Sequence, residues 1–168
     1  MIHLVAFSTL GTSLPPDVKE HINDSDPYHI RYIRFIIDHY DDSDLDYVIF
    51  LRENPEEHMT LSKDAFLRTL TTEPSILLDK TQWLRSMKCA PDGRPHHNGL
   101  EVGNWYLKLG LGASPQDVFE FVAGAQFLVP KSKIRARPKA FYEGLLTHAQ
   151  TGTICQYTLE RLWQCILG

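Results

Sequence analysis

Two short apolar segments separated by one amphipathic helix constrain the fold more than any other feature of this sequence. The segments, residues 2–7 and 47–51, are rich in β-branched and aromatic side chains, which favours buried strands. Between them, isoleucines recur at helical spacing from Ile30 to Ile37, after Pro27, a residue that favours the first helical position. A strand, a helix and a strand in this order are typical of a β-α-β unit. The sequence therefore predicts an α/β fold with a mainly parallel central sheet flanked by helices.

The remaining segments extend this unit. An apolar segment at residues 124–129 ends at Pro130 and is predicted to join the same sheet. Trp163 shares one face of a last helix with Leu159 and Ile166, so we expect it to be buried. Further elements are predicted as follows: helices over residues 62–70, after the S-x-x-D pattern at Ser114, from Pro138 to Gly152 and after Thr153; a short strand at residues 76–78; and a long loop at residues 80–100. With 168 residues and no linker or repeat, the chain is predicted to be a single domain over residues 1–168.

Charge and composition exclude several classes of protein. Lys and Arg total 17 against 21 Asp and Glu, whereas a general nucleic-acid binder carries an excess of cations. No apolar stretch approaches the ~20 residues that span a bilayer, and the apolar run at the N-terminus is too short for a signal peptide. The three cysteines show no repeated spacing, which is typical of free thiols in a reducing compartment. We therefore expect a cytoplasmic protein without nucleic-acid or membrane partners; the oligomeric state stays open.

The polar segment after residues 47–51 is the first candidate for chemistry. Glu53, Glu56 and His58 follow a predicted strand, and ligand sites of parallel α/β sheets lie beyond the carboxyl ends of strands. These three residues are the catalytic candidates, with a carboxylate or His58 as the general base, and Glu53 and Glu56 as ligands of a divalent metal such as Mn or Mg. A charged loop that starts a helix is the alternative interpretation. The acidic run at residues 41–46 lacks the glycine of a calcium-binding loop and is interpreted as a solvated turn.

The long loop offers a second group of candidates. Cys89, His96 and His97 lie within it, but one thiol and two adjacent histidines differ from the closely spaced ligand pairs of most structural zinc sites. His96 and His97 are instead candidates for contact with a ligand.

A basic segment offers a third group. Cations occupy every second position from Lys131 to Lys139, which would place them all on one face of an extended strand but scatter them around a helix. Lys133, Arg135 and Arg137 are candidates for holding a phosphate or diphosphate, and the two guanidinium groups are preferred because each grips two oxygens at once. A basic turn at the surface is the alternative interpretation.

A family resemblance runs through most of the chain. Residues 123–129 and 133–142 join a Gly-Ala-Gln-aromatic strand to a basic helix start, and they resemble domain of unknown function 3431, a family described as glycosyltransferase-like. Residues 158–163 fit the same family and, more loosely, so do residues 32–40, 48–51 and 54–55; only the stretch 123–142 is specific. The resemblance implies a truncated GT-A-like fold. It also implies that Gln126 and the basic segment lie near a donor and acceptor site.

Two functions are compatible with these observations. The first is a glycosyltransferase-like protein that binds a nucleotide sugar, or a related phosphorylated ligand, and transfers the sugar to an acceptor hydroxyl. The alternative is a non-catalytic protein that captures a nucleotide or a small phosphorylated signal. The two Asp-x-Asp patterns within residues 42–46 precede a strand, whereas a GT-A enzyme holds its metal with such a pattern after a strand, which favours the alternative.

The sequence also predicts where the ligand binds. If residues 47–51 and 124–129 run parallel, the loops that follow them open at the same edge of the sheet. Glu53 and Glu56 would then share one cleft with Arg135 and Arg137, with the loop at residues 89–99 beside them.

Overall fold

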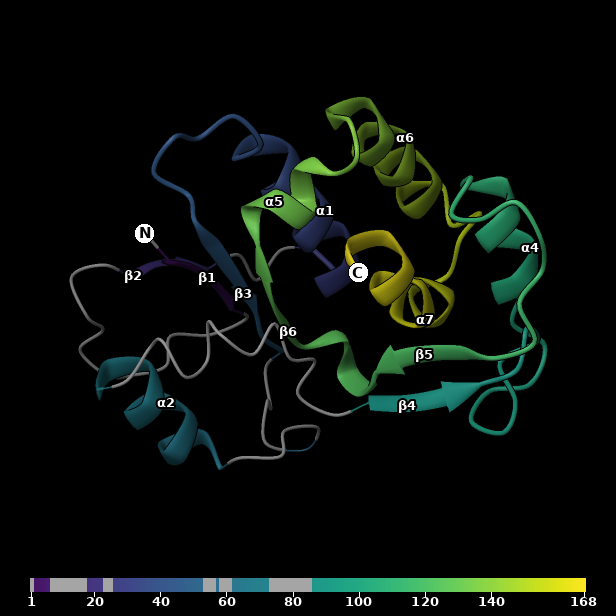
Figure 1. Ribbon diagram of the computed structural model, residues 1–168, viewed down its shortest axis with the longest axis horizontal. Helices are drawn as coiled ribbons and strands as arrows, with labels where there is room; N and C mark the ends of the chain where they lie inside the picture. Colours follow the sequence, from purple (N-terminus) through teal and green to yellow (C-terminus); the bar gives the residue numbers. More distant parts are fainter. Residues whose placement is uncertain (1, 7–17, 23–25, 53–56, 58–61, 73–85) are drawn as a thin grey trace.

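The computed structural model describes residues 2–6, 18–22, 26–52, 57, 62–72 and 86–168 (Figure 1). The strands are β1 (Ile2–Ala6), β2 (Val18–Ile22), β3 (Tyr47–Phe50), β4 (Ser86–Cys89), β5 (Phe119–Val122) and β6 (Phe127–Pro130). The α-helices are α1 (Tyr28–Asp38), α2 (Lys63–Thr72), α4 (Val102–Lys108), α5 (Lys131–Arg135), α6 (Lys139–Gln150) and α7 (Gln156–Leu167), and η2 (Ala123–Ala125) is a 3-10 turn.

A mixed, mostly parallel sheet of four strands confirms the α/β class. The strand order is β2-β1-β3-β6, and β1 runs parallel to both β2 and β3. β6 pairs with β3 in the antiparallel direction, with Phe50 opposite Phe127 and Tyr47 opposite Pro130. The strands expected to share one sheet therefore do so, but the expectation that residues 47–51 and 124–129 run parallel is wrong.

The segment between β5 and β6 explains where the third predicted strand begins. Gly124 and Ala125 both have positive φ values, of 76° and 52°, so the backbone turns there through the left-handed region. Regular strand geometry resumes only at Phe127. Before this turn, β5 forms a separate two-stranded antiparallel sheet with β4.

Two of the predicted helix starts are wrong, and one predicted strand lies outside the described residues. Ser114 begins no helix; the residues after it lead into β5. The last helix begins after Cys155, not Thr153, and the Cys155 Sγ accepts a hydrogen bond from the backbone N of Thr158. The strand predicted at residues 76–78 lies outside the described residues. The helix at residues 62–70 is confirmed as α2, where the Ser62 hydroxyl caps the backbone N of Ala65.

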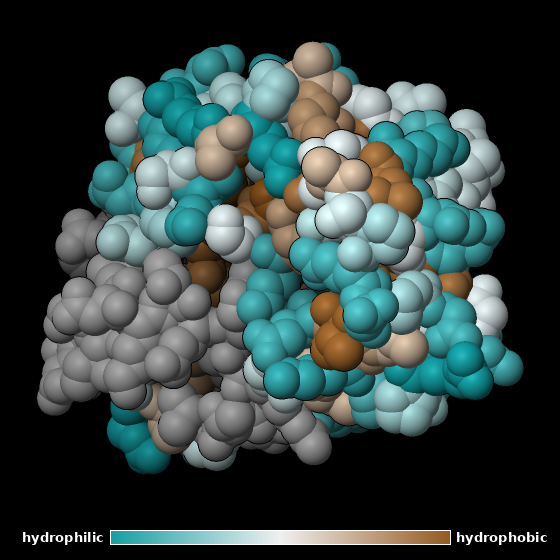
Figure 2. All heavy atoms as spheres, turned by 45° about the vertical axis from the view of Figure 1, so that its right-hand side comes forward, coloured by the Kyte–Doolittle hydropathy of each residue, from teal (hydrophilic) through white to brown (hydrophobic). Residues whose placement is uncertain are grey.

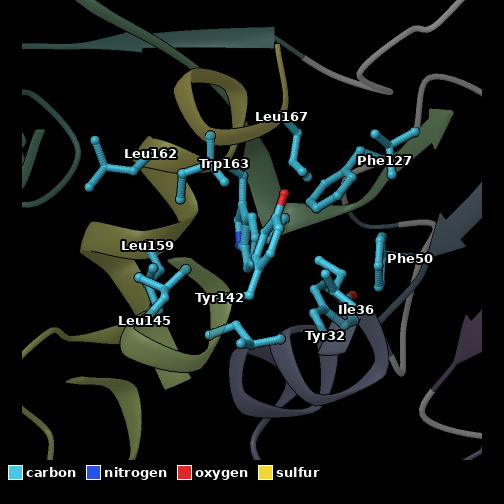
Figure 3. Packing of buried hydrophobic residues seen from close by; sticks show 14 of the residues in the cluster. Tyr32, Ile36, Phe50, Phe127, Tyr142, Leu145, Leu159, Leu162, Trp163 and Leu167 are labelled. Carbon is cyan, nitrogen blue, oxygen red and sulfur yellow. The ribbon is translucent and has the colours of Figure 1, made fainter. Parts of the chain in front are cut away.

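The core lies where α1, α6 and α7 meet β3 and β6 (Figure 3). Trp163 of α7 is 1% exposed, which confirms its predicted burial. Its ring lies 5.7 Å from that of Phe127 and 6.4 Å from that of Tyr32, and Tyr32 lies 4.5 Å from Phe50. These aromatic side chains fix α1 and α7 against the sheet.

The view in Figure 2 shows a surface that is mainly hydrophilic where the chain is described, with small, scattered hydrophobic spots. Among the residues that the structure describes, the exposed large hydrophobic side chains are Leu107, Val118 and Tyr157. Within the described ranges, no helix combines the length and the apolar character needed to cross a membrane.

Candidate functional site

Charged and polar side chains gather beyond the carboxyl end of β3, between the start of α1 and the first two turns of α7. We call this group the β3-end cluster. Its members are Tyr28, Arg52, His97, Gln126, Glu160 and Arg161. They come from α1, the end of β3, the loop after β4, the residue before β6, and α7. Five separate segments of the chain thus meet at one place.

Arg161 is the centre of the cluster and is only 2% exposed. Its Nη1 lies 3.1 Å from the carboxylate of Glu160 and donates to the carbonyl oxygen of Tyr157. Its guanidinium lies 4.4 Å from the centre of the Phe121 ring, so β5 covers one side of it. A buried cation is stable only when it is paired and hydrogen-bonded, and Glu160 supplies the opposite charge.

His97 extends this arrangement to the surface. The Nη2 of Arg161 lies 2.9 Å from Nδ1 of His97, and the imidazole stacks on Tyr157 with ring centres 4.2 Å apart. Because a guanidinium can only donate, Nδ1 must accept, and the ring proton of neutral His97 therefore lies on Nε2. The side chain is exposed, so it presents an N–H donor of fixed orientation at the surface.

The loop before His97 holds this orientation through its backbone. The N of His97 donates to the carbonyl oxygen of Gly93, and the N of Leu100 donates to that of Asp92. Gly93 has a φ of 86°, and a Cβ there would lie 2.3 Å from the carbonyl oxygen of His97. Only glycine fits this close approach of two backbone segments. His96 points elsewhere, with its Nε2 3.1 Å from the carbonyl oxygen of Lys88.

Arg52 and Gln126 form the side of the cluster nearest the sheet. The Oε1 of Gln126, which is 0% exposed, accepts from the backbone N of Arg52, and so continues the β3–β6 ladder by one bond. The guanidinium of Arg52 lies 4.7 Å from the centre of the Tyr28 ring. The hydroxyl of Tyr28 donates to the carbonyl oxygen of Gln156 over 3.5 Å, next to Tyr157. A chain of contacts thus joins Arg52 to His97.

Among the described residues of the cluster, two arginines accompany one carboxylate. Arg161 pairs with Glu160, Arg52 lies over the Tyr28 ring, and Arg31 donates to the carbonyl oxygen of Leu51 nearby. Burial raises the pKa of Tyr28, and the negative charge of Glu160 adds to this, so the phenol stays protonated. Burial also raises the pKa of the Cys89 thiol, an effect that Arg161 opposes. The charges of these described residues suit an anion at the exposed side of the cluster.

The predicted basic site lies at the other end of the sheet. Residues 131–135 form α5, so the cations there scatter around a helix and do not line one extended face. Arg135 donates from Nε to the carbonyl oxygen of Tyr40, and Arg137 donates from Nε and Nη2 to the carbonyl oxygens of Ile166 and Cys165. Lys133 is exposed.

The predicted cleft between the basic segment and the loop after Leu51 is wrong. Because β6 is antiparallel to β3, its carboxyl end lies beside Tyr47, at the amino end of β3. The basic segment therefore meets the acidic turn at residues 41–46, where the backbone N of Lys131 donates to the carbonyl oxygen of Asp46. Arg135 and Arg137 do not share an edge with the loop after Leu51. Arg52, from the segment after Leu51, and His97, from the loop after β4, both belong to the β3-end cluster, whereas residues 53–56 lie outside the described residues.

The other predicted residues divide as follows. Glu53, Glu56 and His58, proposed for catalysis and metal binding, lie outside the described residues. Gln126 and His97 belong to the β3-end cluster, as described above. Glu160 and Arg161 were not selected from the sequence. Two adjacent charges on the last helix, whose apolar residues share one face, were the available signal, because buried charges require partners.

A group of possible metal ligands lies at the opposite end of the sheet. Single ligand atoms of His3, His39 and Asp42 all lie within 4.8 Å of one another. His3 is 1% exposed, and its pKa is lowered by burial and further by His39 and Lys19. The Nδ1 of His39 lies 2.6 Å from Oδ2 of Asp42, a contact that lowers the pKa of that carboxyl group.

The protein is an α/β domain with a four-stranded main sheet, a smaller two-stranded sheet, and the β3-end cluster around buried Arg161. Compared with known proteins, the chain matches no family model, no curated protein and no solved structure. The glycosyltransferase-like resemblance therefore enters the functional argument as a proposal.

Proposed function

We propose that this chain binds a small phosphorylated ligand, with nucleotide sugars as the expected class, at the exposed side of the β3-end cluster. The observation that carries the proposal is the contact between buried Arg161 and exposed His97. This contact orients the Nε2–H group of His97 at the surface as a donor, and it brings no negative charge to the surface.

Arg52 supplies the second donor. Its guanidinium is partly exposed and lies against Tyr28, so it is held in place on an aromatic face. Guanidinium groups bind phosphate oxygens in pairs, and hydrogen bonds to charged groups contribute about 1.5–3 kcal/mol each. The carboxyl end of a parallel strand is also the usual place for ligands in α/β sheets, and β3 is such a strand.

Titration calorimetry of the full chain tests the proposal. The probes are UDP-glucose, GDP-mannose and inorganic pyrophosphate, each with and without manganese. Arg52→Ala should weaken the bound probe by about tenfold or more, as should His97→Ala, because each removes a donor to phosphate. Binding of pyrophosphate alone would show that phosphate, and not the sugar, is recognised.

Two lysine variants locate the site. Lys108→Ala changes an exposed charge on α4 and should leave affinity unchanged. Lys133→Ala should do the same; if it abolishes binding while Arg52→Ala does not, the ligand binds at α5 and the proposal is wrong. Parent protein that binds none of the probes contradicts it as well.

Sugar transfer is tested in the same samples. Manganese-dependent release of free sugar and nucleoside diphosphate would show that the chain breaks the bond between sugar and diphosphate, with water as the acceptor, and would support the transferase alternative. Binding without any turnover would assign it to the non-catalytic alternative.

A further inference from the structure

The His3, His39 and Asp42 group lies where three elements meet. His3 is on the central strand β1, His39 is the residue that ends α1, and Asp42 lies in the turn before β3. Backbone contacts fix the last two relative to each other, because the N of Asp42 donates to the carbonyl oxygen of His39. Lys131 Nζ donates to the carbonyl oxygen of Asp42 and so ties the turn to α5.

Aromatic contacts fix the two imidazoles. The His39 ring lies over Phe35, with centres 4.3 Å apart and planes inclined by 30°. His3 meets the same phenylalanine edge-on at 5.9 Å and His39 at 5.5 Å. The two rings thus share one support and are oriented before any ligand arrives.

From this geometry we propose that His3, His39 and Asp42 bind one zinc ion. Two imidazole nitrogens and one carboxylate oxygen are a zinc ligand set, whereas calcium and magnesium prefer oxygen ligands throughout. Three protein ligands leave one tetrahedral position for water.

The distances fit with small adjustments. Zinc bonds of about 2.0–2.1 Å in a tetrahedron separate the ligand atoms by about 3.3 Å. The 2.6 Å contact of His39 with Asp42 has to open slightly, and the longest separation in the group, at most 4.8 Å, has to close. Rotation of the Asp42 side chain and a small shift of the His39 ring on Phe35 provide both changes, since these side chains are 37% and 26% exposed. The same exposure gives the ion a path from solvent to buried His3.

Both acidic and basic side chains surround the group. Asp44 lies beside the group, with its carboxylate 2.7 Å from Nζ of Lys19, and Asp41 is 79% exposed in the same turn. Lys19 and Lys131 are nearby cations: Asp44 pairs with Lys19, and Lys131 donates to the carbonyl oxygen of Asp42 and not to its carboxylate.

Zinc titration of the full chain, after treatment with a chelator and dialysis, tests the proposal. The parent should bind one zinc ion per chain, and His39→Ala and Asp42→Asn should each weaken this binding by at least ~100-fold, since loss of an outer partner alone costs 10–100-fold. Matched controls are Asp41→Asn, in the same turn, and His96→Ala, in the loop after β4. Both should keep the affinity of the parent.

Cobalt gives an independent readout. Co(II) added to the parent should show the intense visible absorption of a tetrahedral site, and this should be lost in Asp42→Asn while circular dichroism shows the variant folded. A parent that binds no zinc overturns the proposal, as does zinc binding that survives both ligand variants. Loss of binding in His96→Ala, with His39→Ala unaffected, would place the ion in the loop after β4 and also overturn it.

Discussion

The Nε of Arg137 donates a hydrogen bond of 3.1 Å to the carbonyl oxygen of Ile166, in the last turn of α7. Its Nη2 also donates to the carbonyl oxygen of the preceding residue. The last carbonyl groups of a helix have no partner within the helix, and a cation placed there satisfies them and opposes the helix dipole. Arg137 therefore connects the segment between α5 and α6 to the end of α7.

Arg137→Ala should destabilise the protein by about 1–3 kcal/mol, because two charged hydrogen bonds to backbone carbonyls are lost. Lys133→Ala, which removes an exposed cation from the adjacent helix, should change the free energy of unfolding by no more than about 0.5 kcal/mol. Urea denaturation of both variants makes the comparison. Equal stabilities would show that Arg137 does not hold α7.

Removing the charge of Arg161 should have a larger effect. Arg161→Met leaves the buried carboxylate of Glu160 unpaired, which should cost about 3–5 kcal/mol. Adding Glu160→Gln should recover part of that loss, because the remaining groups are neutral. A double-mutant cycle measured by chemical denaturation tests this, and a double variant less stable than Arg161→Met would contradict it.

Trp163→Ala should cost about 3–5 kcal/mol through the cavity it leaves among Tyr32, Phe127 and α6. Leu107→Ala serves as the control because that side chain is 40% exposed, and it should cost far less. If denaturant melts give less than ~1 kcal/mol for the tryptophan variant, α7 is peripheral to the cooperative unit.

Alanine substitutions at two glycines of one loop distinguish the cost of a positive φ from the cost of a steric clash of the added Cβ. Gly93 and Gly99 have φ values of 86° and 84°, but only at Gly93 would a Cβ meet other atoms, at 2.3 Å from the His97 carbonyl. Gly99→Ala should therefore show the strain alone, about 1–3 kcal/mol, whereas Gly93→Ala should cost more and displace His97. Thermal unfolding ranks the two, and the pyrophosphate affinity of Gly93→Ala reports on His97. Equal melting temperatures would contradict the collision.

Acid should destabilise the fold through buried histidines. Burial lowers the pKa of His29 below its ordinary value of 6.5, and the pKa of His3 is lowered too. In the pH range just below 6.5 the unfolded chain binds more protons than the folded one, so stability is full above that value and falls as pH decreases. His29→Phe should make this fall smaller between about pH 7.5 and about pH 5.5. An unchanged fall would show that His29 does not contribute.

The positions of the strands could be predicted from the sequence better than their parallel or antiparallel pairing. Residues 47–50 and 127–130 carry enough β-branched and aromatic side chains to be recognised as strands, but nothing in a strand of four residues records whether its neighbour is parallel. Because β6 pairs with β3 in the antiparallel direction, with Phe50 opposite Phe127, the basic segment after β6 lies at the amino end of β3 and not at its carboxyl end as expected. β2, with Lys19 and Glu20 between apolar ends, has too little pattern for a prediction.

The candidate sites were predicted only in part, for a related reason. Alternating cations in residues 131–139 suggested an extended segment, yet Ile134 is 1% exposed and Tyr142 donates to its carbonyl oxygen, so the core makes this segment helical. Arg161 and His97 are 64 residues apart in sequence, and His3 and His39 are on different elements. Contacts of this kind depend on tertiary packing, which spacing in one sequence does not encode.

The position of β6 at the edge of the main sheet has a consequence for how the chain folds as it is synthesised. Val48 and Phe50 of β3 pair on one side with β1, and on the other side with Val129 and Phe127 of β6. A nascent chain that ends before β6 therefore carries an open strand edge and an uncovered apolar layer, which is the state most exposed to wrong association. β1, β2 and β3 are synthesised well before β6. The main sheet is therefore completed late in synthesis, through a contact between segments far apart in the sequence.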